Sequence, residues 1–232
     1  MTALDGIVFD KDGTLFDFRA TWEAWAAAFL RRAAEGDKGL AADLGARIGY
    51  DYARQVFEPG SVVIAGTPGD IADALEGALA LERAGLISLL NEEAARAPQR
   101  EAVPLDPFLS GLAAQGLKLG VATNDAEKPA RAHLEAAGVL GRFDFVAGFD
   151  SGFGGKPAPG QLKAFCAATG CDPARVAMVG DSTHDLFAAR AAGMLRIAVL
   201  TGLAAEAELA PHADVVLPNI GHIPGWLEAE AR

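Results

Sequence analysis

Cysteine is scarce in this sequence: Cys166 and Cys171 are the only two among 232 residues. Neither belongs to a Cys-x-x-Cys pair or to a cluster of cysteine and histidine. This pattern predicts two free thiols in a reducing compartment, so we expect a cytoplasmic protein.

Basic residues are also few. Lysine and arginine number 20 against 31 aspartates and glutamates, which gives a formal net charge of -11. A nucleic-acid-binding protein usually presents a basic face, so this balance predicts no nucleic-acid partner. It also disfavours binding to anionic membrane surfaces. A phosphate ester would need local positive groups, namely a metal ion, a lysine or backbone N–H groups.

Long apolar runs are absent too. No uncharged stretch approaches the roughly 18 residues that cross a membrane, and no basic segment followed by an apolar one opens the chain. We therefore expect neither a membrane-spanning helix nor a signal peptide. Hydrophobic residues nevertheless make up 51% of the chain, which is enough for a sizeable core. The length suits one large domain or one domain with an insert.

Apolar stretches typical of strands alternate with helical stretches over the second half of the chain. We expect helices that end at Gly138 and Gly170, where glycine can close the last turn. The predicted strands are residues 7–9, 117–124, 143–149, 176–180, 195–200 and 215–217. This alternation predicts an α/β fold with a doubly wound parallel sheet.

Residues 17–101 have a different pattern. Apolar side chains recur at helical spacing in residues 21–34, and residues 40–57, 70–83 and 86–97 are predicted to be further helices. Apart from a short Val-Val-Ile run at 62–64, no strand pattern occurs there. We therefore predict an all-helical insert at 17–101, in a core made of residues 1–16 and 102–232.

The sequence Asp10-Lys11-Asp12-Gly13-Thr14 follows the first predicted strand directly. Ligands of open α/β sheets bind outside the carboxyl ends of the strands, and residues two apart in an extended segment point the same way. Two converging carboxylates can hold a divalent cation, or one can attack an electrophile while the other moves a proton. A plain turn, in which Asp, Gly and Thr are common, is the alternative.

Three further polar groups follow strands and should reach the same edge of the sheet. Thr123 and Asn124 can donate hydrogen bonds to phosphoryl oxygens or simply form a turn. Lys156 precedes a proline, which favours an extended backbone that could aim its ammonium at the site. Asp181 fits a third metal-facing carboxylate, whereas Asp185 also fits a helix-capping box that begins at Ser182.

Taken together, four segments resemble the motifs of the haloacid dehalogenase-like (HAD) hydrolase superfamily, and most closely its phosphoglycolate phosphatase-like branch. They are Asp10-Lys11-Asp12-Gly13-Thr14, Thr123-Asn124, Lys156-Pro157-Ala158-Pro159 and Gly180-Asp181-Ser182-Thr183-His184-Asp185. The resemblance implies a Rossmann-like core with residues 17–101 as a helical-bundle cap. It also implies a Mg²⁺-dependent phosphatase, acting on a small phosphorylated metabolite such as a phosphoglycolate-like compound or a sugar phosphate.

The resemblance also implies roles for single residues. Asp10 would be the nucleophile that forms an aspartyl-phosphate, and Asp12 the acid and then the base. Thr123 would bind the phosphoryl group, and Lys156 would neutralise charge beside it. The metal would be held by Asp10, the Asp12 carbonyl and Asp181, with Asp185 as a ligand or as an orienter of its waters.

Several alternatives stay open. A phosphomutase of the β-phosphoglucomutase type shares the four motifs, whereas the second carboxylate at Asp12 disfavours a metal-free dehalogenase. Arg19, near the start of the insert, is a candidate contact for an anionic substrate, with a solvated residue before a helix as an equal alternative. The Gly-broken segment 60–69 is a second candidate for specificity. We expect a monomer or a homodimer.

Overall fold

The computed structural model describes residues 4–230, apart from the side chain of Ala65. Its contacts divide the chain into two compact units. The first unit ends at Phe18 and resumes at Gln99, and the second is Arg19–Pro98. No helix within the described residues is long and apolar enough to cross a membrane.

The first unit, here called the core unit, contains six parallel strands among its described residues, in the order β5-β4-β1-β6-β7-β8. The strands are β1 (Gly6–Phe9), β4 (Lys118–Ala122), β5 (Phe145–Ala147), β6 (Val176–Gly180), β7 (Leu195–Val199) and β8 (Val215–Leu217). Strands β1 and β6 are buried at every position, as expected for a parallel sheet covered on both faces. The predicted doubly wound α/β fold is therefore confirmed.

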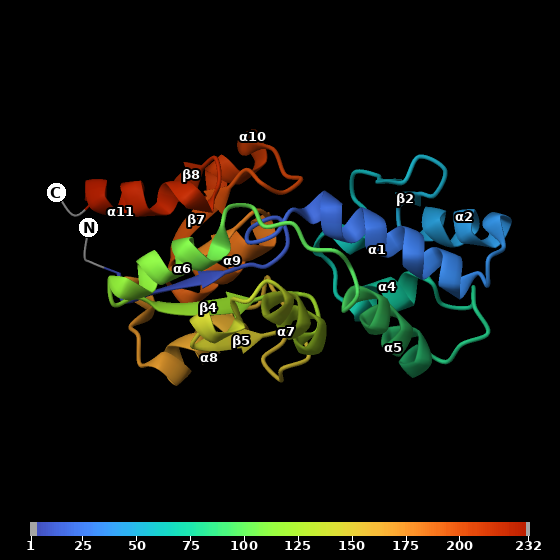
Figure 1. Cartoon of the computed structure of the whole chain (residues 1–232), viewed down its shortest axis with the longest axis horizontal. Helices are drawn as coiled ribbons and strands as arrows, with labels where there is room; N and C mark the ends of the chain where they lie inside the picture. Colours follow the sequence, from blue (N-terminus) through green and yellow to red (C-terminus); the bar gives the residue numbers. More distant parts are fainter. Residues whose placement is uncertain (1–3, 231–232) are drawn as a thin grey trace. The chain divides into compact units, whose positions relative to one another are not determined.

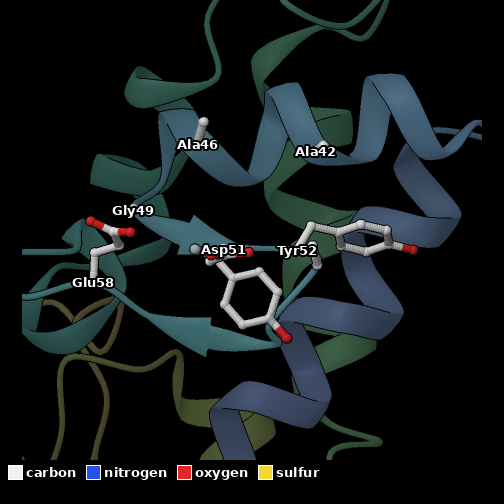
Figure 2. Close-up of a pocket in the computed structure, with 8 residues that line it drawn as sticks. Ala42, Ala46, Gly49, Asp51, Tyr52 and Glu58 are labelled. Atoms are coloured by element: carbon white, nitrogen blue, oxygen red, sulfur yellow. The ribbon is translucent and has the colours of Figure 1, made fainter.

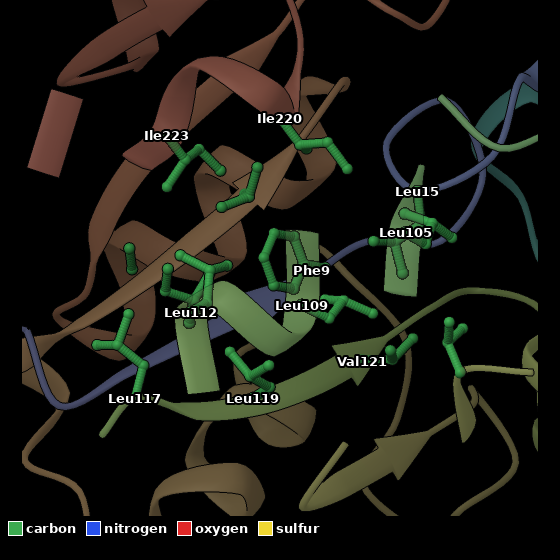
Figure 3. Close-up of a cluster of buried hydrophobic side chains, with 14 of the residues drawn as sticks. Phe9, Leu15, Leu105, Leu109, Leu112, Leu117, Leu119, Val121, Ile220 and Ile223 are labelled. Carbon is green, nitrogen blue, oxygen red and sulfur yellow. The ribbon is translucent and has the colours of Figure 1, made fainter. Parts of the chain in front are cut away.

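Helices cover both faces of this sheet (Figure 1). They are α6 (Leu105–Ala114), α7 (Glu127–Ala136), α8 (Gly160–Thr169), α9 (Thr183–Ala192), α10 (Glu206–Leu209) and α11 (Ile223–Glu230). Alternate residues of a strand point to opposite faces. Accordingly Phe9 packs with Leu109 of α6 on one face (Figure 3), while Val8 packs with Phe165 of α8 on the other.

The strand order reverses direction at β1. The chain runs from β1 outward to β4 and β5, and then returns to the other side of β1 for β6, β7 and β8. Such a reversal opens a crevice at the carboxyl ends of the two strands that flank it. In register, Phe9 lies beside Val121 of β4 and Val179 of β6, so the residues that follow these three strands reach the same edge of the sheet.

The chain leaves and re-enters the core unit through two adjacent segments. The backbone N–H of Asp17 donates to the carbonyl of Arg100 at 2.8 Å, and that of Ala102 donates to Leu15 at 2.9 Å. The Arg100 guanidinium also forms an ion pair with the Asp17 carboxylate. These contacts join the two crossings on the core side, although Asp17 and Arg100 are 83 positions apart in the sequence.

The second unit, here called the helical unit, is mostly α-helical. Its helices are α1 (Phe18–Ala33), α2 (Lys38–Arg47), α3 (Val62–Ala65), α4 (Pro68–Ala74) and α5 (Arg83–Ala94). Within it, Trp25 stacks on Phe29 and its indole N–H donates to the carbonyl of Leu90 at 3.2 Å. These contacts place the aromatic residues of α1 in the interior of the unit.

The expectation of an all-helical insert is wrong at one place. The predicted helix 40–57 ends at Arg47, and a two-stranded antiparallel hairpin follows, made of β2 (Tyr50–Asp51) and β3 (Val56–Phe57). Gly49 adopts a φ of 71°, a left-handed conformation that cannot continue an α-helix. Glycine suits this position because a residue with a Cβ would be strained there. The predicted helix 70–83 likewise stops at Ala74, before Gly77 with a φ of 69°.

Candidate active site

Three buried carboxylates gather at the reversal point of the sheet. Asp10 follows β1, and Asp181 and Asp185 follow β6. Each offers an oxygen that lies within 4.8 Å of the others, and all three residues are buried. Three negative charges at this distance repel one another strongly in a dry site, so the cluster requires positive charge.

The pKa values of Asp10 and Asp181 are raised by burial and by this repulsion. Burial raises the pKa of Asp10 to about 7; Lys156 opposes that shift, while Asp185 and Asp12 add to it. Burial, followed by repulsion from Asp10 and Asp185, raises the pKa of Asp181 well above its usual range. A bound cation would relieve both penalties by favouring the ionised carboxylates.

Lys156 supplies part of the positive charge. Its Nζ donates to Oδ1 of Asp10 and to Oδ1 of Asp185, each at 2.6 Å. Burial alone would lower the pKa of Lys156, but the attraction of these two carboxylates outweighs burial and raises it. Lys156 is therefore charged when it contacts the predicted nucleophile.

The Lys156 backbone is fixed by Asn124. The Asn124 side-chain N–H donates to the carbonyl of Lys156 at 3.0 Å, and the Lys156 backbone N–H donates to Asn124 Oδ1 at 2.8 Å. This reciprocal pair joins the loop after β4 to the loop before α8. The structure thus gives Asn124 a positioning contact, and its contact with a phosphate stays a prediction.

Thr123 is buried and held by two neighbours. Its Oγ1 accepts the backbone N–H of Asp125 at 3.1 Å, and its carbonyl accepts Nε2 of Gln161 at 2.9 Å. The hydroxyl proton of Thr123 is not used in the contact with Asp125, so it can be donated to an oxygen of a ligand. Gln161, a fully buried residue of α8, was not among the site residues predicted above.

Asp185 combines two of the interpretations that the sequence left open. Its Oδ2 accepts from the backbone N–H of Ser182 at 3.0 Å and from the Ser182 hydroxyl at 2.7 Å. The other oxygen, Oδ1, accepts from Lys156. One carboxylate therefore both stabilises the start of α9 and contributes to the charged cluster.

Asp181 has a different environment from Asp185. Among residues 4–230, no ion pair is formed by its carboxylate, which instead lies against the backbone of two glycines. A Cβ at Gly13 would stand 2.3 Å from Asp181 Oδ2, and one at Gly202 only 1.6 Å from the same atom. Thr201 fixes this arrangement, since its hydroxyl donates to the carbonyl of Gly13 at 2.6 Å. Sequence reasoning missed Thr201 and Gly202, because the segment after β7 has no motif of its own.

Asp12 stands apart from the three-carboxylate cluster. Its two side-chain oxygens, Oδ1 and Oδ2, lie 2.7 and 2.6 Å from Nζ of Lys11, a fully buried lysine that the sequence did not single out. The two carboxylates of the first motif thus have separate lysine partners, Lys156 for Asp10 and Lys11 for Asp12.

Arg19 belongs to the helical unit. Its side chain is 62% exposed and pairs with Glu23, one helical turn further along α1, at 3.2 Å. A surface pair of this kind contributes little to stability. A contact between Arg19 and a substrate stays a prediction.

The sequence model for haloacid dehalogenase-like hydrolases matches residues 4–193, which include all four motifs and most of the core sheet. The chain belongs to this family. The cluster of Asp10, Asp181 and Asp185 suits a hard divalent cation. Its donor atoms are all carboxylate oxygens, and Lys156 compensates their negative charge only in part.

Relatives of this HAD-like hydrolase include named phosphatases. A probable phosphatase, IndB, of Dickeya dadantii is 37% identical over 57% of this chain and 59% of its own length. A phosphoglycolate phosphatase of Rhodospirillum rubrum is 36% identical over 52% of this chain and 50% of its own. The chain thus spans only 50–59% of the length of these curated relatives.

A solved structure extends the likeness to nearly the whole chain. The crystal structure of a predicted phosphoglycolate phosphatase from Haemophilus somnus has a TM-score of 0.70 and covers 97% of this chain and 99% of its own. Its sequence identity is 22%, so this likeness concerns the fold alone.

Proposed function

We propose that this protein is a Mg²⁺-dependent phosphatase that hydrolyses a small phosphomonoester through an aspartyl-phosphate on Asp10. The observation that carries the proposal is the contact of Lys156 Nζ with Asp10 Oδ1, at 2.6 Å, inside the cluster of three carboxylates. This arrangement offers a nucleophile, a fixed cation and a site for a second cation within a few ångströms. The phosphatases among the relatives support the same activity.

In the first step, the free oxygen of Asp10 attacks phosphorus, and the bond from phosphorus to the ester oxygen breaks. Asp12 transfers its proton to the departing oxygen, which leaves as an alcohol. Lys156 and the Thr123 hydroxyl stabilise the charge on the transferred phosphoryl group. Phosphoryl transfer depends mainly on such positioning and charge stabilisation.

In the second step, a water oxygen attacks phosphorus, and the bond between phosphorus and Asp10 breaks. Asp12, now a carboxylate, accepts the proton of the water. The products are inorganic phosphate and the original Asp10. This cycle needs a second carboxylate close to the nucleophile, and Asp12 provides it two residues further along the chain.

Mg²⁺ is the cation that we assign to the cluster, since it prefers oxygen ligands and binds phosphate oxygens. Asp10, the Asp12 carbonyl and Asp181 would hold it, with Asp185 as a ligand or as an orienter of its waters. When bound, it supplies charge neutralisation for the phosphoryl oxygens.

We assign the helical unit, Arg19–Pro98, the role of a cap that selects the leaving group. The predicted insert, residues 17–101, has nearly the same limits. A pocket of about 400 Å³ lies within this unit, between α2 and the β2–β3 hairpin (Figure 2). Its charged lining residues, Asp51 and Glu58, are both acidic, so it does not suit the phosphate end of a substrate.

The relatives and the site together support a proposal for the substrate class. We propose a phosphoglycolate-like compound or a sugar phosphate, since the core offers groups for one phosphate and one metal ion. A phosphomutase of the β-phosphoglucomutase type would return the phosphate to a sugar instead of to water. Release of free phosphate, measured beside isomer formation, separates the two activities.

The test is an assay of phosphate release over a panel that includes 2-phosphoglycolate, sugar phosphates and p-nitrophenyl phosphate. Each compound is assayed with Mg²⁺ and again with excess chelator. We expect hydrolysis of at least one ester that stops when the metal is removed. Full activity in chelator would contradict the metal requirement, and isomer formation without phosphate release would favour the mutase.

A further inference from the structure

Lys11 is an unusual residue, because a lysine is almost never fully buried unless it is paired. It lies between Asp10 and Asp12, and its side chain has no exposed surface. Lys156 already provides a cation at Asp10. The buried charge of Lys11 therefore needs a separate explanation.

Two residues from another part of the core unit complete the environment of Lys11. His133, on α7, places Nδ1 at 3.1 Å from Lys11 Nζ, and Asp125, just before α7, places Oδ2 at 3.6 Å. Both residues are buried. The other oxygen of Asp125 accepts the backbone N–H of Ala126 at 2.8 Å, which fixes the carboxylate at the start of the helix.

The geometry at Asp12 is restrictive. The Lys11 ammonium lies 2.7 Å from Oδ1 and 2.6 Å from Oδ2 of Asp12, and the same ammonium lies 3.6 Å from Oδ2 of Asp125. Breaking such a buried arrangement leaves an uncompensated charge, so the Lys11 side chain has little freedom to move. The orientation of the Asp12 carboxylate is consequently tied to α7 through Lys11.

We propose that Lys11, anchored by Asp125 and His133, is a positioning residue that orients Asp12 for proton transfer to the leaving oxygen. The proposal rests on the phosphatase activity proposed above. During the first step, the proton moves from one oxygen of Asp12 to the ester oxygen, while the other oxygen remains on Lys11. Lys11 keeps all its protons, and its charge stabilises the carboxylate that forms on Asp12.

This role predicts a dependence on the leaving group. An alkyl phosphate releases a strongly basic alkoxide unless an acid protonates it, whereas p-nitrophenyl phosphate releases a stable phenolate that needs little help. The quantity to measure is kcat/KM with Mg²⁺, for p-nitrophenyl phosphate and for the best alkyl ester of the panel. It reports the steps up to the first phosphoryl transfer.

The decisive variant is Lys11→Met, which keeps the length of the side chain and removes its charge. General acid catalysis contributes typically about 10²- to 10⁴-fold, so we expect kcat/KM for the alkyl ester to fall by at least about 10²-fold. For p-nitrophenyl phosphate we expect a loss below about fivefold. Lys118→Met is the matched control, because Lys118 pairs with Asp144 at a 49% exposed position at the start of β4. It should change neither value.

Asp125→Asn provides a second, milder variant if Lys11→Met does not fold. It keeps the shape of the side chain and removes one charge that holds Lys11, so the alkyl ester should again be affected more than the aryl ester. Equal losses for the two esters in the folded variant would overturn the inference and make Lys11 a structural residue. If the wild type hydrolyses neither ester, the proposed function itself is wrong.

Discussion

Gly202 and Asp181 are in such close contact that a single added carbon would collide. A Cβ at Gly202 would lie 1.6 Å from Asp181 Oδ2, far below any real contact distance. Gly202→Ala should therefore displace the predicted metal ligand without disturbing the hydrophobic core. By analogy with changes to residues that orient metal ligands, we expect the apparent affinity for Mg²⁺ to fall by about 10–100-fold.

The measurement is a Mg²⁺ titration of phosphatase activity and of thermal stability. Gly111→Ala is the matched control, because a Cβ at Gly111 in α6 would meet no atom within 4 Å. It should leave the titration unchanged and stabilise the helix slightly. An unaltered Mg²⁺ response in folded Gly202→Ala would show that Asp181 does not hold the metal.

Asp10→Asn tests the nucleophile. The substitution keeps the size of the side chain but removes the attacking charge, so kcat should fall by at least about 10³-fold, as loss of a covalent nucleophile costs several kcal/mol. Circular dichroism should show an intact fold. Asp106→Asn, at an exposed ion pair with Arg142, is the control and should retain normal turnover. Near-normal turnover in folded Asp10→Asn would remove Asp10 from the mechanism.

The pKa of Asp10, raised by burial to about 7 from 3.8, predicts a pH dependence of stability. The folded state holds this proton more tightly than the unfolded state. The stabilising contribution is therefore complete below about pH 4 and is lost as pH rises towards 7. The difference in unfolding free energy between the metal-free wild type and Asp10→Asn should reveal this loss together with the change in the pKa of Asp181, which Asp10 repels, while titrating groups outside the cluster cancel.

Mg²⁺ competes with the proton for the same carboxylates. Its stabilisation should be small at pH 5 and large at pH 8, where a concentration about 100 times Kd should raise Tm by roughly 5–10 °C. Differential scanning fluorimetry at the two pH values, with Ca²⁺ and Na⁺ as comparison ions, measures it. A Tm shift that is the same at both pH values would argue against binding at ionised Asp10 and Asp181.

The core of the sheet gives a prediction about stability alone. Leu109 of α6 is fully buried against β1 and β4, so Leu109→Ala should lower the unfolding free energy by about 2–5 kcal/mol. Leu81→Ala, at a 48% exposed position, should change it by less than about 0.5 kcal/mol. Chemical denaturation measures both. A small effect at Leu109 would mean that α6 is not packed as described.

Exchange of the helical unit tests the source of specificity. In the chimera, residues 19–98 of this protein are replaced by the equivalent segment of a relative with another substrate. The chimera should adopt that relative's substrate ranking and should still require Mg²⁺. The cut points lie beside Asp17 and Arg100, whose contacts stay within the core unit. An unchanged ranking in a folded chimera would place specificity in the core.

Local patterns predicted much of the core sheet. Strand β6 begins and ends where its apolar run does, because a buried parallel strand must be apolar throughout. The short edge strand β8 also matches its apolar run, although its three residues are only partly buried. Helix α6 was not predicted, although Leu105, Leu109 and Leu112 have helical spacing. Pro107 obscured it, yet proline is tolerated in the first turn, where the missing N–H has no helical partner. The β2–β3 hairpin was missed because strands of two residues show no alternation.

The kinds of group at the site could be predicted from local patterns: carboxylates, a threonine and a lysine that stand close behind an apolar strand or just before a proline. How these groups pair depends on the folded core. Lys156 reaches Asp10 across 146 positions of sequence, and Lys11 reaches His133 across 122. Such pairs depend on which strands lie side by side and on which helix covers them, and these are set by packing of the whole core. A local sequence pattern therefore indicates which chemical groups are present, whereas the partner of each buried charge depends on the tertiary fold.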